Sequence, residues 1–473
     1  MRRLLPALLA LVAASSAAAG TVTGTSRADG LMAAFDGVHR VDCGAGADVI
    51  AADLTDRLTR CETVSRRLSV DLYRNADSQH ESAVEPDSFA VGSTVVSVFQ
   101  VGRRENGAAA NIGAAVSTDA GRTWTRSYLP ATTVNASPAG PETAASDPAV
   151  AYDVVHGVWL VSSLTLERSN SHIYVSRSTD GRSWSPPVDA ASGPILDKEW
   201  VTCDNGASSP YRGRCYLAYT DDQRGTTVAQ YSTDGGVTWS PPVRAGSILV
   251  GAQPVTLPDG TLVVVAGDYR GQEALDGSMV ALRSTDGGVT FTRNLVADFE
   301  AADNSPMRAI ALPSADVDAS GTIYAVWHDC RFRSRCAAND MVVSSSTDGV
   351  TWTAPARIDL GPGSFFIPGL GADPSRPGRL GLVYANYRSG SHLLGIGFAQ
   401  SRDGGKTWKT QRLDPKSMST SWLPRAEGGR MVGDYFSVSF AGDRVVPVFA
   451  LAAAPVAGRL RQGIFAASLR PLG

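Results

Sequence analysis

Lysine is almost absent from this chain of 473 residues, in which nearly all of the 43 basic side chains are arginine. The only lysines are Lys198, Lys406, Lys409 and Lys416. The formal net charge is -3, so the sequence lacks the excess of positive charge that attracts nucleic acid. We therefore expect no nucleic-acid partner.

Long apolar runs are also missing, since no stretch after the N-terminus is long and apolar enough for a membrane helix. The N-terminus begins with Arg2 and Arg3, continues as a short run rich in Leu and Ala, and has small residues at 17–19 before Gly20. This order is typical of a signal peptide. We predict that residues 1–19 are removed and that the protein is secreted, without a membrane span and as a monomer.

Cysteine and histidine are few, with six of each. An even number of cysteines in an exported chain favours disulfides, and six cysteines allow fifteen pairings. Proximity favours the local set. No Cys-x-x-Cys spacing is present, so no zinc or other metal site is predicted from cysteine. The expected disulfides are Cys43–Cys61, Cys203–Cys215 and Cys330–Cys336.

The motifs of several common enzyme classes are absent as well. The sequence contains no Walker loop, dinucleotide fingerprint, zinc-protease helix or nucleophile elbow. No cofactor requirement is therefore predicted.

What the chain has instead is one short motif in six copies. A typical copy is Ser232-Thr-Asp-Gly-Gly-Val-Thr-Trp239, and the starts of successive copies are separated by 61, 54, 52, 62 and 55 residues. The Asp can accept hydrogen bonds from turn amides, and Gly supplies a positive φ, which is the chemistry of a hairpin turn. A fixed period of this size predicts a repeat architecture. The copies lie at 117–124, 178–184, 232–239, 284–291, 346–352 and 401–408.

This motif resembles the Asp box of sialidase-like proteins, the bacterial neuraminidase repeat. The resemblance covers nearly all of the chain after residue 80 and implies a β-propeller fold. Asp boxes lie on hairpins away from the active site in that family, so the resemblance gives the six Asp residues a structural role.

Short β-prone runs recur four to a unit from about residue 64 onward, which is the pattern of a propeller blade. After the sixth box, the runs at 434–440, 445–451 and 463–469 form a unit that lacks its fourth strand. Residues 67–73 could supply it. We therefore predict an all-β propeller over 64–473 with seven blades, closed by an N-terminal strand; six blades, as in sialidases, are the alternative.

Residues 20–63 precede this region. Residues 20–30 are rich in Gly, Ser and Thr and are interpreted as a linker, while 41–53 resembles one degenerate turn of the calcium-binding nonapeptide repeat. Calcium is therefore the one ion that this part could bind. Since calcium is shared between adjacent turns of such a repeat, a small segment closed by Cys43 and Cys61 is the alternative.

Ligands of propellers meet the mouth of the central channel, where the inner strands begin. The polar cluster at 196–200 is the longest of these places, and its Trp200 offers a face for a sugar ring. Salt bridges between blades are the alternative explanation for the charged residues. The candidates at the starts of the inner strands are Glu85, Asp147, Lys198, Glu199, Trp200, Arg308, Asp434 and Tyr435.

The resemblance to sialidases implies roles for some of these residues. Tyr435 takes the place of the nucleophile, Glu199 that of its activating partner, and Arg308 that of a clamp for an anionic group. Asp147 and Asp434 are further catalytic candidates, whereas Lys198, Trp200 and Glu85 are assigned to substrate binding.

The sequence departs from the sialidase pattern at two places. The Arg-Ile-Pro motif of the first blade is replaced by Glu85-Pro86, and 107–112 lacks the acid/base Asp. Losing such groups costs about 2–4 kcal/mol of transition-state stabilisation each. The sequence thus predicts a secreted, exo-sialidase-type or related glycoside hydrolase with a modified site and a glycan substrate. A non-catalytic propeller that binds glycan or protein is the alternative.

Overall fold

The computed structural model describes residues 20–37, 39–166, 170–270, 275–388, 391 and 393–472. The expected signal peptide, residues 1–19, lies outside the described residues. Within these ranges helix is confined to two 3-10 turns, η1 (Ser334–Cys336) and η2 (Thr420–Trp422), and no helix is long and apolar enough to cross a membrane. The prediction of an all-β fold is confirmed.

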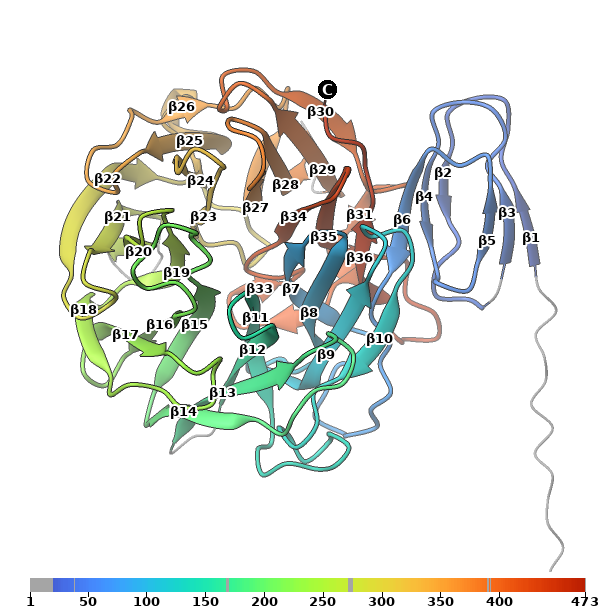
Figure 1. Ribbon diagram of the computed structural model, residues 1–473. Helices are drawn as coiled ribbons and strands as arrows, with labels where there is room; N and C mark the ends of the chain where they lie inside the picture. Colours follow the sequence, from blue (N-terminus) through green and yellow to red (C-terminus); the bar gives the residue numbers. More distant parts are fainter. Residues whose placement is uncertain are drawn as a thin grey trace, which may run out of the picture.

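Most of the chain forms sheets of four antiparallel strands, taken in sequence order and arranged around a common centre (Figure 1). The first strand of each group lies innermost. One residue pair, Ala109 opposite Ala145, joins the first two groups. The groups are β7 (Ala83–Val91), β8 (Thr94–Arg103), β9 (Ala109–Ser117) and β10 (Thr125–Tyr128); β11 (Ala145–Asp153), β12 (Val158–Thr165), β13 (Ser171–Ser178) and β14 (Val188–Gly193); β15 (Leu196–Cys203), β16 (Cys215–Asp221), β17 (Thr226–Ser232) and β18 (Val243–Ser247); β19 (Val250–Thr256), β20 (Leu262–Arg270), β21 (Asp276–Ser284) and β22 (Thr292–Glu300); β23 (Ser314–Val317), β24 (Ile323–Asp329), β25 (Asp340–Ser346) and β26 (Ala356–Arg357); and β27 (Ser364–Ala372), β28 (Leu380–Tyr387), β29 (Leu393–Ser401) and β30 (Lys409–Arg412).

Three short strands follow the last complete group and lead back to the centre. The first pairs with β29, and the other two form a hairpin whose second strand lies beside the inner strands in Figure 1. They are β31 (Met418–Ser419), β32 (Arg425–Ala426) and β33 (Gly429–Arg430).

The last sheet is completed from the N-terminal side. Its own strands are β34 (Ser437–Ala441), β35 (Arg444–Ala452) and β36 (Gln462–Ala467), and β6 (Thr63–Arg67) pairs antiparallel with β36. The sequence suggested residues 67–73 for this position, so the strand begins and ends earlier than expected. Leu68 makes the final backbone bond to Ile464, at 2.7 Å, after which the chain leaves the sheet.

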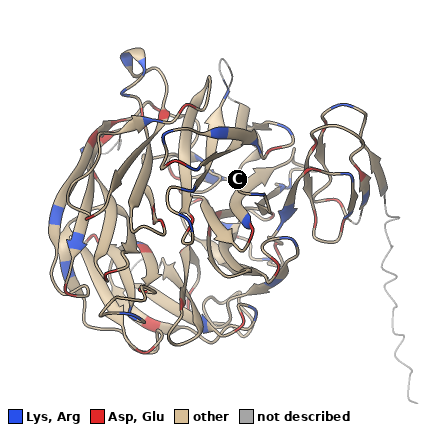
Figure 2. Cartoon of the chain, turned by 45° about the horizontal axis from the view of Figure 1, so that its top comes forward, with Lys and Arg blue, Asp and Glu red and all other residues tan. Residues whose placement is uncertain are grey.

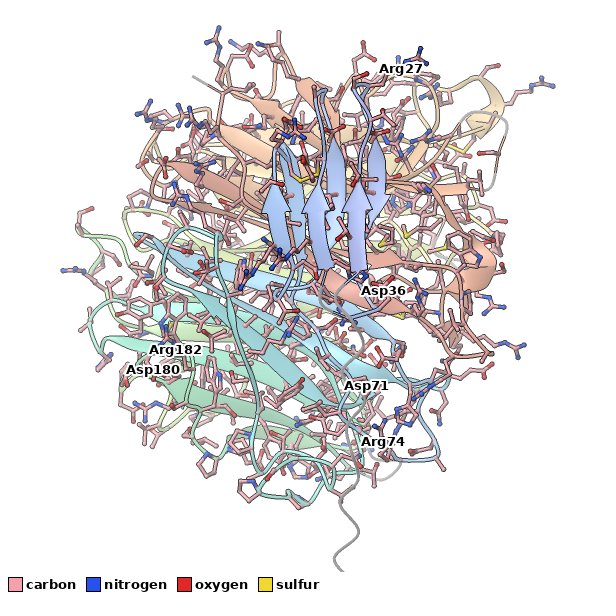
Figure 3. The ribbon with its side chains drawn as sticks, turned by 90° about the vertical axis from the view of Figure 1, so that its right-hand side faces the viewer. Arg27, Asp36, Asp71, Arg74, Asp180 and Arg182 are labelled. Atoms are coloured by element: carbon pink, nitrogen blue, oxygen red, sulfur yellow. A yellow bond between two sulfur atoms is a disulfide. The ribbon has the colours of Figure 1, made fainter. Side chains whose placement is uncertain are left out.

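The segment before β6 is a stack of parallel strands and not a linker followed by one turn. One sheet contains β1 (Gly20–Thr23), β3 (His39–Asp42) and β5 (Arg57–Thr59); the other contains β2 (Gly30–Met32), β4 (Val49–Ala52) and β6. Figure 3 shows parallel strands of this part side by side, with Arg27 and Asp36 at opposite ends. The sequence pattern revealed one turn because the other turns lack its glycines.

Carboxyl groups and a disulfide hold these turns together. The amide of Asp29 donates to Asp48 in the next turn at 2.7 Å, and the amide of Asp48 donates to Glu62 at 3.0 Å. The Cys43–Cys61 disulfide joins the same turns covalently. Side chains thus satisfy backbone donors at the corners, where the strands have ended.

The Asp boxes form hairpin turns, as their residues indicate. In the third box, Asp234 accepts from the amides of Val237 and Thr238 at 3.0 Å and from the Thr238 hydroxyl at 2.6 Å. Partial burial raises the pKa of Asp234, but the hydrogen bonds from Thr238 and Ser232 outweigh this effect and lower it to about 2. The carboxylate is therefore a structural part of the turn.

Replacing this carboxylate tests that role. Asp234→Ala leaves the turn donors without their acceptor, so we expect a loss of about 1–3 kcal/mol in the free energy of unfolding, measured with urea at pH 7. Because the native pKa lies below the ordinary value, this contribution is present above about pH 4 and disappears as the pH falls toward 2. Thr233→Ala, an exposed neighbour, is the control; equal stability of the two variants would contradict the assignment.

Truncation tests the role of β6. A chain beginning at Glu62 keeps β6, whereas one beginning at Ser69 exposes the hydrogen-bonding edge of β36. We expect the first to remain folded and soluble and the second to melt at a clearly lower temperature or to aggregate, measured by circular dichroism and light scattering. Equal melting temperatures of the two chains would show that β6 is dispensable.

Candidate functional site

The inner strands share an irregularity close to their starts. In five of them the pairing with the next strand shifts register, and one residue at the shift has a left-handed backbone. Such bulges redirect side chains, and a non-glycine residue held at positive φ costs about 1–3 kcal/mol, which is common at functional sites. The residues and their φ values are Glu85 (53°), Asp147 (45°), Lys198 (52°), Gly251 (69°) and Ile367 (54°).

Three of these bulge residues meet in one buried cluster. The Lys198 ammonium lies 3.2 Å from Asp147, 3.9 Å from Glu85 and 2.8 Å from Asp434, which precedes β34. All four side chains are at most 8% exposed. The structure therefore brings together four predicted site residues from three inner strands, β7, β11 and β15, and from the segment before β34.

Arg308 joins the cluster through the same aspartate. Its Nε and Nη2 donate to the two oxygens of Asp434, at 2.9 and 2.8 Å. Its backbone amide donates to Arg430 of β33 and its Nη1 to the carbonyl of Glu427, so the β32–β33 hairpin holds it in place. The clamp predicted for a substrate anion here holds a carboxylate of the protein itself.

The carboxyl groups of the cluster have different proton affinities. Burial raises the pKa of Asp434, but Lys198 and Arg308 outweigh it and hold this pKa well below its ordinary value. Burial, reinforced by Asp147, raises the pKa of Glu85 to about 8. One carboxyl is thus ionised and its neighbour largely protonated at neutral pH, an arrangement that suits acid/base chemistry.

Glu199, Trp200 and Tyr435 lie beside the cluster around a small cavity of about 20 Å³. Burial, and then Asp147, raises the pKa of Glu199 well above its ordinary value, and neither of its oxygens has a hydrogen-bond partner among the described residues. The cavity has room for one water molecule.

Tyr435 packs its ring against Trp200 with 4.9 Å between the ring centroids. Its hydroxyl donates to the carbonyl of Pro148 at 3.4 Å, and burial followed by Glu85 raises its pKa well above 10. No hydrogen bond between Tyr435 and Glu199 occurs among the described residues. The expected nucleophile and its partner are therefore neighbours without the contact that activation requires.

The sequence did not indicate Gln100, which orients Glu85. This buried β8 side chain donates to the Glu85 carboxyl and, at 3.0 Å, to the Ser146 hydroxyl, and its carbonyl faces Arg103. An amide side chain between Phe99 and Val101 in a β-prone run was the available signal.

Asp87 was also missed, although it follows Glu85 in the same strand. It accepts from the amide of Val150 at 2.8 Å and from the hydroxyl of Ser437 at 3.1 Å, linking β7 to its two neighbours. Burial raises its pKa to about 7. With Asp316 it lines a channel of about 150 Å³ that lies between the inner strands.

Figure 2 shows most strands without charged residues, which gather in turns and connections.

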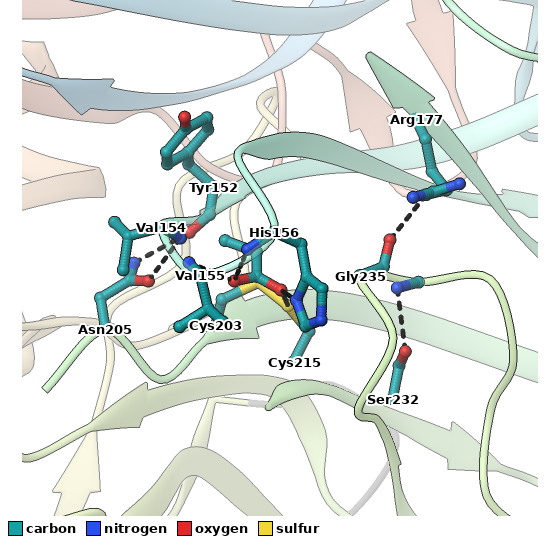
Figure 4. Close-up of a disulfide and its surroundings, with 12 residues drawn as sticks. Tyr152, Val154, Val155, His156, Arg177, Cys203, Asn205, Cys215, Ser232 and Gly235 are labelled. Atoms are coloured by element: carbon teal, nitrogen blue, oxygen red, sulfur yellow. Dashed lines mark hydrogen bonds and ion pairs between the residues drawn. A yellow bond between two sulfur atoms is a disulfide. The ribbon is translucent and has the colours of Figure 1, made fainter. Parts of the chain in front are cut away.

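At the far end of β15 the Cys203–Cys215 disulfide joins β15 to β16, and Asn205 forms hydrogen bonds with the backbone of Val154 and Tyr152 in the neighbouring sheet (Figure 4). The remaining pair, Cys330–Cys336, is also a disulfide, so the structure forms all the pairs that the spacing favours.

Glu300, Cys330 and Cys336 form the one group of three metal-binding side chains found among the described residues. Its two cysteines are joined in a disulfide and cannot bind a metal in this state. Calcium binding by the N-terminal turns stays a prediction.

The third Asp box lies within residues 230–241, which match the family model for the BNR/Asp-box repeat. No curated protein matches the chain. Among solved structures, the chain is similar to an ulvan lyase of polysaccharide lyase family PL25, with 11% identity, 84% of this chain and 96% of that chain covered, and a TM-score of 0.51.

Two further similarities are weaker. A protein of unknown function from Dyadobacter fermentans has 17% identity over 86% of this chain and 99% of that chain, with a TM-score of 0.46. A Hadza microbial sialidase has 16% identity over 86% and 69%, with a TM-score of 0.42. At such identities a likeness shows the fold alone. The motif match and the shared fold are consistent with the sialidase-like propeller superfamily, as the Asp boxes indicated.

The raised pKa of Glu85 predicts a pH effect on stability. Between its ordinary value of 4.5 and about 8, the native state keeps a proton that the unfolded chain releases, so this stabilising contribution is full below 4.5 and is lost as the pH rises through 8. Glu85→Gln cannot lose a proton. We expect the melting temperature of the wild type, relative to that of the variant, to fall from pH 5 to pH 8.

Glu105→Gln, at an exposed position, is the control for this measurement and should follow the wild type at every pH. A pH-independent difference between the wild type and Glu85→Gln would mean that Glu85 does not keep its proton in the folded state.

Proposed function

We propose that the protein is a secreted glycoside hydrolase with a modified sialidase-type site at the mouth of a closed, seven-bladed propeller. The observation that carries this proposal is the pair of buried carboxyl groups Glu85 and Asp147, which share Lys198, with the pKa of Glu85 raised to about 8 by burial and then by Asp147. Glycoside hydrolysis needs a carboxylic acid and a carboxylate at the same bond.

The geometry supports a division of roles. Glu85, protonated and oriented by Gln100, is placed to give a proton to the oxygen of the leaving group. Asp147, on the adjacent inner strand, supplies the carboxylate, either as nucleophile or as base for water. Lys198 fixes the positions of both carboxyl groups, and Asp434 fixes Lys198 and Arg308.

The other candidates contribute to binding in this proposal. Trp200 and Tyr435 form an aromatic wall, and the bulge positions Gly251 and Ile367 carry no charge. Trp200 also lines the channel of about 150 Å³, and this channel, not the cavity of about 20 Å³, is the space that the proposal gives to a sugar ring.

The seven-bladed ring is supported by contacts between successive inner strands. β7, β11, β15, β19, β23, β27 and β34 each contact the next, and β34 contacts β7. Side chains also bond the amide of the neighbouring inner strand, as Gln253 does with Ala315 at 2.8 Å and Ser314 with Leu370 at 3.0 Å. The proposed mature protein begins at Gly20, with the propeller over 64–473.

A propeller that binds glycan or protein without catalysis is the second candidate. The observation in its favour is that Lys198 and Arg308 are already paired with carboxylates of the protein and that Tyr435 is not activated.

Two variants test the proposal against this alternative. We expect Glu85→Gln and Asp147→Asn to lower kcat/KM by at least 100-fold on whichever glycoside of a fluorogenic panel the wild type cleaves, because each removes a proton-transfer or nucleophilic group. Asp268→Asn, which removes an exposed ion pair with Arg293, is the matched control and should keep full activity. Absence of turnover by the wild type on every glycoside, with retained glycan binding, would leave the binding propeller.

A further inference from the structure

The two cations of the Lys198 cluster, Lys198 and Arg308, are paired with carboxyl groups of the protein itself. Arg308 bonds both oxygens of Asp434, and Lys198 lies between Asp434 and Asp147. Glu85 and Glu199 are buried in surroundings that favour their protonated forms, and Asp197, the residue before Lys198, is a further buried carboxyl group whose pKa burial and then Asp147 raise to about 6. Both cations thus have acidic partners from the protein itself before any ligand binds.

This pairing of Lys198 and Arg308 limits the charge that a bound sugar can carry. A carboxylate or sulfate placed here would add a negative charge beside Asp434 and Asp147, and it would have to break the bidentate Arg308–Asp434 pair to find a cation. A buried charge without a partner is strongly disfavoured. The hydroxyl groups of an uncharged sugar can instead donate to these carboxylates in charge-assisted hydrogen bonds.

We infer that the sugar unit recognised at the Lys198 cluster is uncharged, so that the ligand is a neutral glycan and not a conjugate of sialic or uronic acid. As a statement about a substrate this rests on the proposed function, but the preference applies equally to binding without turnover.

Fluorogenic glycosides test the inference where there is turnover. With 4-methylumbelliferyl glycosides of neutral pentoses and hexoses, of sialic acid and of glucuronic acid, we expect kcat/KM for the best neutral sugar to exceed that for either acidic sugar by at least 100-fold. Faster cleavage of an acidic glycoside would overturn the inference and leave the proposed function intact. Absence of all turnover would contradict the proposed function, and the inference would then be decided by binding.

Binding is measured by calorimetry with arabinose, galactose, N-acetylneuraminic acid and glucuronic acid as probes. The wild type should bind a neutral sugar and neither acid. Asp434→Asn frees Arg308 and should gain affinity for the acids by at least 10-fold, and Arg308→Gln added to it should abolish the gain. Binding of an acid by the wild type in preference to both neutral sugars would overturn the inference, as would binding of neither class.

Asp434→Asn removes a buried partner and can fail to fold, which circular dichroism will show. In that case Arg308→Gln alone decides the matter: its preference for neutral over acidic sugars should equal that of the wild type. Loss of acid binding in this variant, compared with the wild type, would show that Arg308 serves as an anion clamp.

Discussion

The buried cluster at the starts of the inner strands depends on one ammonium group. Lys198 reaches from β15 to carboxyl groups of β7, of β11 and of the segment before β34, so a single side chain links three inner strands and this segment. Removing one partner from a buried ion pair typically costs about 3–5 kcal/mol, because the other charge stays buried without compensation. The near absence of lysine elsewhere in the inner strands shows that this charge is specific to one place in the repeat.

The bulges explain how a repeated backbone carries a site that is not repeated. The left-handed residue near the start of an inner strand is Glu85, Asp147 or Lys198 on one side, and Gly251 or Ile367 on the other. The bulge gives the side chain the same direction in each of these strands, whereas the residue type at the bulge differs from strand to strand. Polar side chains two residues later bond the next inner strand, as Asp87 does with Val150, so the same strands hold the ring together.

The pairing of charges at this site affects both the stability of the fold and the kind of ligand that can bind. The carboxylates that make a buried Lys198 tolerable also occupy Arg308, and so they remove the free cation on which recognition of acidic sugars depends. Glu85, which stands where the sialidase pattern has an arginine, adds a carboxyl group and not a cation to this cluster.

The repeat, the hairpin turns, the disulfide pairs and the list of charged residues at the strand starts could be predicted from the amino-acid sequence, because each follows from short-range spacing and turn chemistry. The sequence did not reveal the stack of parallel strands at 20–67, since only one of its turns has the glycine pattern, or that Gln100 orients Glu85. That Arg308 and Lys198 share Asp434, a residue 126 positions from Arg308, is visible in the folded protein and could not be predicted from the chain. The reason is physical: burial and the pairing of charges depend on which sheets become neighbours, and no local pattern in the chain contains that information.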